Sequence, residues 1–225
     1  MKSVFSYWRI RDARPLLVVL LTMAAGPVAA QGGAPAGPET SFVFQVFGGA
    51  PLNIPTGLTI HHEALGSVRH RATWVSRPVQ QPFYWALRTR WQRRDDGFEL
   101  QLLHHKIYLQ NNPESIDHLE ITHGFNVLTV NYLRRSYPVQ PRLGIGVVIP
   151  DAESVVLGEF HQDGYKIAGP ALMVGAGWEH ARGRHVLVAA DAQFIAGWAA
   201  VDIAGGEARV RSLALHLLLG LGLGF

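Results

Sequence analysis

From residue 41 onward, hydrophobic and polar positions alternate with a period of two over eight stretches of the chain. The stretches are 41–49, 83–93, 98–108, 118–134, 141–150, 168–180, 184–198 and 208–225. Alternation of this kind is typical of β-strands whose two faces meet different surroundings. We therefore predict an all-β fold of eight antiparallel strands, with no internal repeat and no second domain.

The last stretch states the pattern most clearly, as LALHLLLGLGLGF over residues 213–225. Leucine takes the odd positions until Phe225, and Ala, His, Leu and three glycines take the even ones. An outward leucine face and a nearly empty inward face suit a lipid-facing strand of a narrow transmembrane barrel. A terminal phenylalanine on such a strand also resembles the signal that the outer-membrane assembly machinery reads, so that machinery is an expected partner.

Charged and amide side chains fall on the opposite face of the other strands, which predicts a polar barrel interior. The expected inward residues are Arg88, Arg90, Glu99, Gln101, Glu120, Arg142, Asp191 and Gln193. A soluble lipocalin-like barrel would instead need an apolar lumen. Buried charges must pair, because a lone buried charge is costly, and eight strands leave room for little more than side chains. A general diffusion pore is therefore disfavoured, while a polar site that opens outward stays possible.

The connections alternate between short and long, as in an up-and-down outer-membrane barrel with its short turns in the periplasm. The short ones are 93–97, 135–141 and 180–184, and the longer ones are 50–82, 109–117, 150–167 and 199–207. In the first long connection, strand-like pieces at 57–63 and 67–76 predict a hairpin above the barrel mouth. Aromatic residues of the outward face form two groups, one for each membrane interface: Phe83, Trp85 and Trp198, and Trp91, Phe98, Tyr132, Trp178 and Phe225.

Residues 1–30 have the form of a secretory signal, with a basic start, an apolar stretch from Leu16 to Ala25 and small residues before Gln31. We predict cleavage before Gln31; the alternative is an uncleaved anchor. Residues 31–40 then form a flexible periplasmic leader, and residues 41–225 form the barrel. The expected location is the bacterial outer membrane.

The composition narrows the function classes. The first thirty residues hold four of the 20 Lys and Arg and one of the 17 Asp and Glu, which leaves 16 of each and no net formal charge. This balance removes the main support for nucleic-acid binding. The chain has no cysteine, which excludes disulfides and a lipoprotein anchor. We expect a monomer.

Histidine supplies the first candidate chemistry, because four of the 11 histidines flank one predicted hairpin at the outer rim: His104, His105, His118 and His123. Clustered imidazoles suit divalent metals, so His104, His118 and His123 are predicted ligands, with Glu120 or Glu63 to complete the set. Scattered surface histidine is the alternative, since no tight ligand motif is present. His104 also shares the parity of the outward leucines before it. Either the rim stands above the lipid, or the faces switch near His104 and Gly124.

The first long connection carries Arg69, Arg71 and Arg77 beside Trp74. Guanidinium groups bind phosphate through paired hydrogen bonds. This surface therefore predicts contact with the phosphates of lipopolysaccharide, and an ordinary solvated loop is the alternative.

Four stretches together resemble outer-membrane β-barrel proteins of the lipid A oxidase type. They are PFYWALR (82–88), ELQLLHHKIY (99–108), LEITHGFNVLTVNYLRR (119–135) and RLGIGVVIP (142–150). The resemblance implies oxidation of the proximal glucosamine of lipid A by molecular oxygen in the outer leaflet. By the same resemblance, the residues to suspect are His104, Lys106, Glu120, His123, Asn126 and Asn131. His105 departs from the pattern, which often has an aromatic residue there.

These lines combine into one main hypothesis, an outer-membrane barrel that modifies lipid A. The predicted catalytic residues are His104, Glu120, His123 and Asn126. The predicted substrate-binding residues are Lys106, Arg69, Arg71 and Arg88. A divalent metal and molecular oxygen are the expected cofactors. The alternatives are a non-enzymatic structural or ligand-binding barrel and a narrow selective channel.

Overall fold

Fifteen β-strands make up the secondary structure of the described part of the computed structural model, which covers residues 40–225 except 115, 122, 136–138 and 183. The predicted signal peptide and the leader up to residue 39 lie outside the described residues. Among the residues that are described, no helix is long and apolar enough to cross a membrane.

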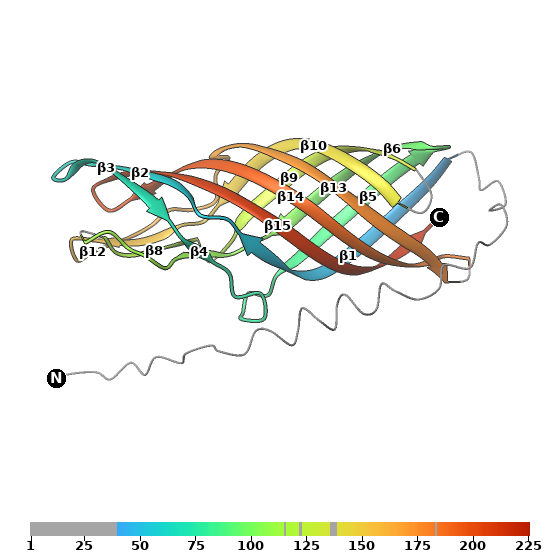
Figure 1. The fold of residues 1–225 in the computed structure, drawn as a ribbon, viewed down its shortest axis with the longest axis horizontal. Coiled ribbons are helices and arrows are strands. Elements are labelled where there is room, and N and C mark those ends of the chain that lie inside the picture. Colours follow the sequence, from blue (N-terminus) through green and yellow to red (C-terminus); the bar gives the residue numbers. More distant parts are fainter. Residues whose placement is uncertain (1–39, 115, 122, 136–138, 183) are drawn as a thin grey trace. The chain divides into compact units, whose positions relative to one another are not determined.

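Eight of the strands close into the predicted antiparallel barrel (Figure 1). In order around the barrel they are β1 (Thr40–Asn53), β5 (Trp85–Arg93), β6 (Asp96–His104), β9 (Phe125–Arg134), β10 (Val139–Pro150), β13 (Gly169–Arg182), β14 (Val186–Ile203) and β15 (Gly206–Gly224). Strand β15 pairs with β1, for example at Leu219 and Gly48. This pairing leaves no open edge, as a strand assembly in lipid requires.

A β-sandwich-like extension continues the barrel at its long-loop end, here called the outer end. Strands β2 (Thr56–His62) and β3 (Gly66–Ala72) form the predicted hairpin and add to the first part of β15. A second sheet has the order β12 (Glu159–Gln162), β11 (Glu153–Val156), β8 (Ile116–Ile121), β7 (Ile107–Leu109) and β4 (Trp74–Val75). Buried apolar side chains of both sheets join one cluster, which includes Leu58, Ile60, Ile107, Leu119, Ile121 and Val210.

Two features of the extension differ from the sequence-based expectation. The expected loop 199–207 is instead a hairpin, because β14 and β15 stay paired as far as Ile203 and Gly206. Their inward residues there, such as Val201 and Ala208, are fully buried in the apolar cluster, which stabilises strands above the membrane. The expected strands 98–108 and 118–134 each divide in two, after His104 and before Phe125.

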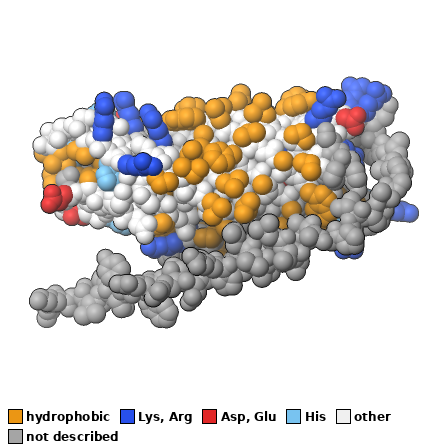
Figure 2. Space-filling model, in the orientation of Figure 1, with side chains coloured by type: hydrophobic (Ala, Val, Ile, Leu, Met, Phe, Trp, Pro, Cys, Tyr) orange, Lys and Arg blue, Asp and Glu red, His pale blue; other side chains and the backbone are white. Residues whose placement is uncertain are grey.

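The outward faces form an apolar belt, as the period-two pattern predicts (Figure 2). Leu143, Ile145 and Leu221 are 65%, 68% and 64% exposed, which would be unfavourable in water. Both predicted aromatic groups lie on this surface, and Phe42 joins the short-turn group by packing on Trp91 and Phe225. A closed barrel with such a belt is an outer-membrane barrel.

The barrel interior holds a network of three arginines and three carboxylates, namely Arg88, Arg90, Arg142, Glu99, Glu179 and Asp191. Asp191 joins two of the arginines, since its carboxylate accepts from Arg88 at 2.6 Å and from Arg142 at 2.5 Å. The six formal charges cancel. Glu120, expected inside, is instead on β8 of the extension; the parity argument failed because the chain breaks between β8 and β9. Glu179 takes the place of that carboxylate in the network.

Removing one carboxylate from this network should destabilise the barrel strongly. Asp191→Asn leaves two buried guanidinium groups short of charge, a change that costs about 3–5 kcal/mol. Asp202→Asn is the control, because Asp202 pairs with Lys166 at an exposed site, where a pair contributes about 0–1 kcal/mol. Urea unfolding of the refolded proteins in lipid vesicles measures both. Equal stability of the two variants would contradict the structural role of the network.

Candidate functional site

An open pocket of about 470 Å³ lies on the outside of the barrel wall, at the upper edge of the apolar belt. It is lined by Pro82, Trp85, Leu102, His104, His123, Asn126, Ile149 and Tyr165. Trp85, Leu102 and Ile149 belong to the outward faces of their strands. We call this the lateral pocket, because it opens sideways from the wall and not into the lumen.

One row of paired residues across four strands builds the lateral pocket. Trp85 of β5 lies opposite His104 of β6, and Asn126 of β9 lies opposite Ile149 of β10. Paired residues of an antiparallel sheet project from the same face, so all four side chains stand on the outside. The Trp85 and His104 rings stack with centroids 5.3 Å apart and planes 9° apart.

Asn126 fixes the orientation of the His104 ring. The Oδ1 atom of Asn126 lies 2.8 Å from Nδ1 of His104. An amide oxygen only accepts hydrogen bonds, so the proton of a neutral imidazole lies on Nδ1 and leaves a lone pair on Nε2. Nε2 is buried and has no partner among the described residues. His104 therefore offers a free proton acceptor at the pocket.

Gly124 allows this close contact. Its φ angle is 124°, in a region that side chains rarely adopt, and a Cβ atom there would overlap Oδ1 of Asn126 and Nδ1 of His104. The backbone turns at this point from β8 of the extension into β9 of the barrel. The predicted interruption at Gly124 is confirmed, and its physical reason is the space that the His104–Asn126 pair needs.

His123 forms the part of the lateral pocket nearest the extension. Its Nδ1 lies 3.1 Å from a carboxylate oxygen of Glu153 and 3.7 Å from one of Asp151. The Tyr165 hydroxyl donates to the His123 carbonyl at 2.7 Å. The imidazole is about half exposed, so it is held by acidic neighbours yet open to a ligand.

The structure thus brings together three of the four predicted catalytic residues: His104, His123 and Asn126. Glu120 does not line the lateral pocket, since its carboxylate pairs with His118 at 2.7 Å on β8. His105 turns the other way and is buried, where its ring lies 4.9 Å from that of His216 and its Nε2 lies 2.9 Å from the Ser76 hydroxyl. The four rim histidines therefore divide among three environments.

The predicted substrate-binding residues are also dispersed. The Lys106 ammonium donates to the Gln80 carbonyl at 2.8 Å; burial and the Arg77 guanidinium lower its pKa, and Glu120 opposes this shift. Lys106 thereby fastens the loop before β5. The Arg88 prediction needs correction, because its guanidinium is fully buried in the lumen and bonded to Asp191 and Gln101. Arg69 and Arg71 lie on β3, outside the lateral pocket.

The predicted metal ligands do not form a set. Among the described residues, no three His, Cys, Asp or Glu side chains gather as metal ligands. His118 is occupied by Glu120 and is remote from the residues that line the lateral pocket. We therefore derive no step through a metal, and metal binding stays a prediction.

Sequence reasoning missed Trp85 as a partner of His104, although the signal was present. The short turn at Arg94 and Asp95 sets the register of β5 and β6, with Arg93 opposite Asp96. Counting equally backward and forward from that turn reaches Trp85 and His104. Tyr165 and Glu153 had no such signal, because they come from a long connection whose path depends on the extension.

Comparison with protein-family models and with curated proteins finds no match. Among solved structures, the neisserial surface protein NspA is similar at 13% identity and a TM-score of 0.41, over 84% of this chain and 98% of that one. OprG of Pseudomonas aeruginosa is similar at 10% identity and 0.44, over 83% and 96%. Ail of Yersinia pestis, an attachment invasion locus protein, is similar at 11% identity and 0.41, over 83% and 99%.

The His104–Asn126 contact predicts a specific imidazole tautomer. His104 should carry its proton on Nδ1, and Asn126→Leu should shift it towards the Nε2–H form that free imidazole favours. Long-range ¹H–¹⁵N spectra of the protein in detergent micelles distinguish the two forms. The control is Asn112→Leu, in the extension, which should leave the His104 signals in place. An Nε2–H tautomer in the unchanged protein would contradict the geometry.

Gly124→Ala should disturb the same contact, because its Cβ atom meets both partners. Gly158→Ala is a matched control, since Gly158 also has a positive φ, 80°, but nothing lies within 4 Å of the position that its Cβ atom would take. Both variants carry backbone strain, and only Gly124→Ala should change the His104 tautomer spectrum. A shift of equal size in both would show that strain alone is responsible.

Proposed function

We propose that this outer-membrane barrel binds lipid A at the lateral pocket and modifies it there, with oxidation of the proximal glucosamine as the favoured reaction. The observation that carries the proposal is the division of the pocket into two parts. Trp85, Leu102 and Ile149 continue the apolar belt, while His104, Asn126 and His123 stand at its upper edge. A lipid in the outer leaflet presents acyl chains and sugars in the same order.

The geometry suits an amphipathic ligand that enters from the membrane. Its acyl chains would contact the apolar side chains without leaving the bilayer, so little new desolvation is needed. Its sugar would meet the free Nε2 atom of His104 and the half-exposed imidazole of His123. The lumen is filled by the ion network, which leaves the wall as the place for such a site.

In the proposed reaction, His104 acts as a general base. Its neutral imidazole would accept the proton of the anomeric hydroxyl at Nε2, and Asn126 would hold the ring in position. The anomeric carbon is oxidised by two electrons, and molecular oxygen takes these electrons and two protons to give hydrogen peroxide. Water then opens the resulting lactone to the acid, so the sugar gains one oxygen atom.

The alternative is a non-enzymatic barrel that binds lipopolysaccharide or another ligand through its outer part. The rigid extension favours it, because the apolar cluster there supports two sheets above the membrane. Both functions fit a monomer that the assembly machinery inserts through its last strand. They differ only in whether the lateral pocket changes what it binds.

Mass spectrometry of lipid A from cells with and without the protein tests the proposal. We expect a gain of one oxygen on the proximal sugar, which His104→Ala and His123→Ala should reduce by about 10²–10⁴-fold, the usual contribution of a general acid or base. His180→Ala is the control, since His180 stacks on Trp178 near the short-turn end. An unchanged spectrum with folded protein in the outer membrane would favour the non-enzymatic barrel, and altered acyl chains would replace oxidation by another reaction.

A further inference from the structure

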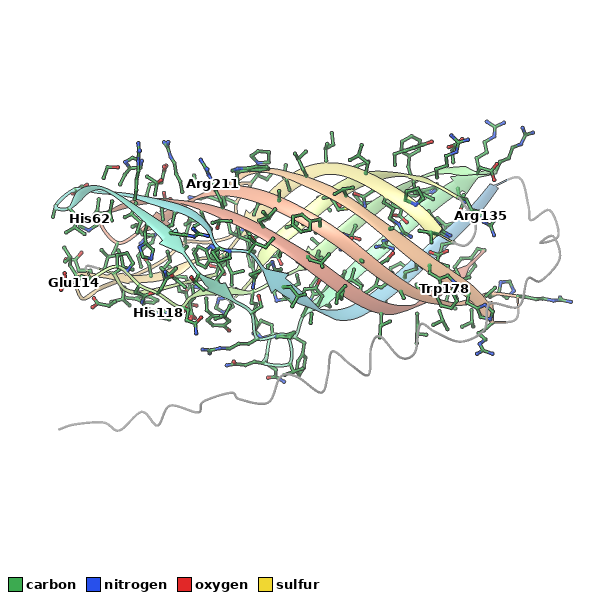
Figure 3. All side chains as sticks on the ribbon, viewed as in Figure 1. His62, Glu114, His118, Arg135, Trp178 and Arg211 are labelled. Atoms are coloured by element: carbon green, nitrogen blue, oxygen red, sulfur yellow. The ribbon has the colours of Figure 1, made fainter. Side chains whose placement is uncertain are left out.

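A second surface feature faces the membrane boundary, on different strands from the lateral pocket. The odd residues of β15 share one face, which runs from the exposed leucines through Leu213 to Arg211 and Arg209. Guanidinium groups thus replace leucines at the level where the apolar belt ends. Figure 3 shows Arg211 between the outer tip, marked by His62, and the short-turn end, marked by Trp178.

Two further arginines, from a distant part of the chain, lie on the same face. Arg69 of β3 is opposite Thr59 of β2, and Thr59 is opposite Arg209 of β15. One step nearer the belt, Arg71 is opposite Gly57, and the same register places Arg211 on the other side of Gly57. All four arginines are exposed. We call them the arginine patch.

The spacing in the lower row suits one phosphate group. Neighbouring strands are about 4.8 Å apart, so the backbones at Arg211 and Arg71 are separated by about twice that distance. Gly57 has no side chain, and nothing lies within 4 Å of the position a Cβ would take. Two long guanidinium side chains can therefore converge on an anion over the open backbone of β2.

The charge of the arginine patch is only partly compensated. Among the described residues, Arg209 is the one member with an ion-pair partner, Glu207 at 2.9 Å. On the membrane side of the lower row, Trp198 of β14 lies opposite Arg211 and is 38% exposed. Figure 2 shows Lys and Arg side chains gathered beside the hydrophobic belt on this face. An apolar wall, an interfacial tryptophan and a cationic row follow one another, as they would along a phosphorylated glycolipid.

We propose that the arginine patch binds the phosphorylated sugar headgroup of one lipopolysaccharide molecule in the outer leaflet, as a site separate from the lateral pocket. Strands β1 and β5 separate β15 from β6 around the barrel, so the ligand is a second lipid molecule beside the protein. The patch holds it and does not modify it. This site stands whether or not the lateral pocket is catalytic.

Native mass spectrometry of the refolded protein in neutral detergent micelles tests the site. The probes are deep-rough lipopolysaccharide with its phosphates and the same lipid after enzymatic removal of the phosphates. The test variant is Arg71→Gln with Arg211→Gln. Arg93→Gln with Arg135→Gln is the matched control, which removes two exposed arginines at the short-turn end. Gly57→Glu is a second test variant, because it adds a carboxylate between the two guanidinium groups and keeps both of them.

We expect the unchanged protein and the control to retain the phosphorylated lipid with equal affinity. Both test variants should bind it more weakly, on the order of tenfold, since each loses charge-assisted contacts. The dephosphorylated lipid should bind weakly to all forms. Heat-modified mobility on gels confirms that each variant is folded. Equal binding by the test variants, or equal binding of the dephosphorylated lipid, would overturn the proposal; His104→Ala should leave this binding unchanged.

Discussion

The ion network inside the barrel is the constraint on which the rest of the structure depends. Three arginines and three carboxylates cancel one another in a lumen too narrow for water-filled passage. Each charge has its partner on another strand, so the network also holds the strands in one register around the closed barrel. Because the interior is filled in this way, any ligand has to meet the outside wall or the extension.

The outside wall offers two such places, both at the level where the apolar belt ends. The lateral pocket combines lipid-facing side chains with an imidazole whose Nε2 atom is free. The arginine patch combines an interfacial tryptophan with exposed guanidinium groups. They follow the same order from apolar to polar, which is imposed by the membrane boundary. They differ in chemistry, because only the first offers a proton acceptor.

The extension makes both places possible. Its apolar cluster keeps β14 and β15 paired above the membrane, where Arg209 and Arg211 project. It also positions β11, whose Glu153 holds His123 at the lateral pocket. Gly124 connects the two parts, since its positive φ lets the chain leave β8 and enter β9 beside His104. A barrel without this extension would have a belt but neither site.

The period-two pattern by itself determined the barrel, its belt and its polar interior, because side-chain parity is a local property of each strand. It also placed Arg88, Arg90 and Arg142 inside and the leucines before Phe225 outside. Only the tertiary structure decided which residues meet. Glu179 replaced Glu120 in the network, Arg88 lost its predicted role in binding substrate, and Arg209 and Arg211 joined Arg69 and Arg71 across β2. These outcomes depend on strand register, on the breaks at His105 and Gly124 and on barrel closure, and all of these involve contacts between segments far apart in the chain.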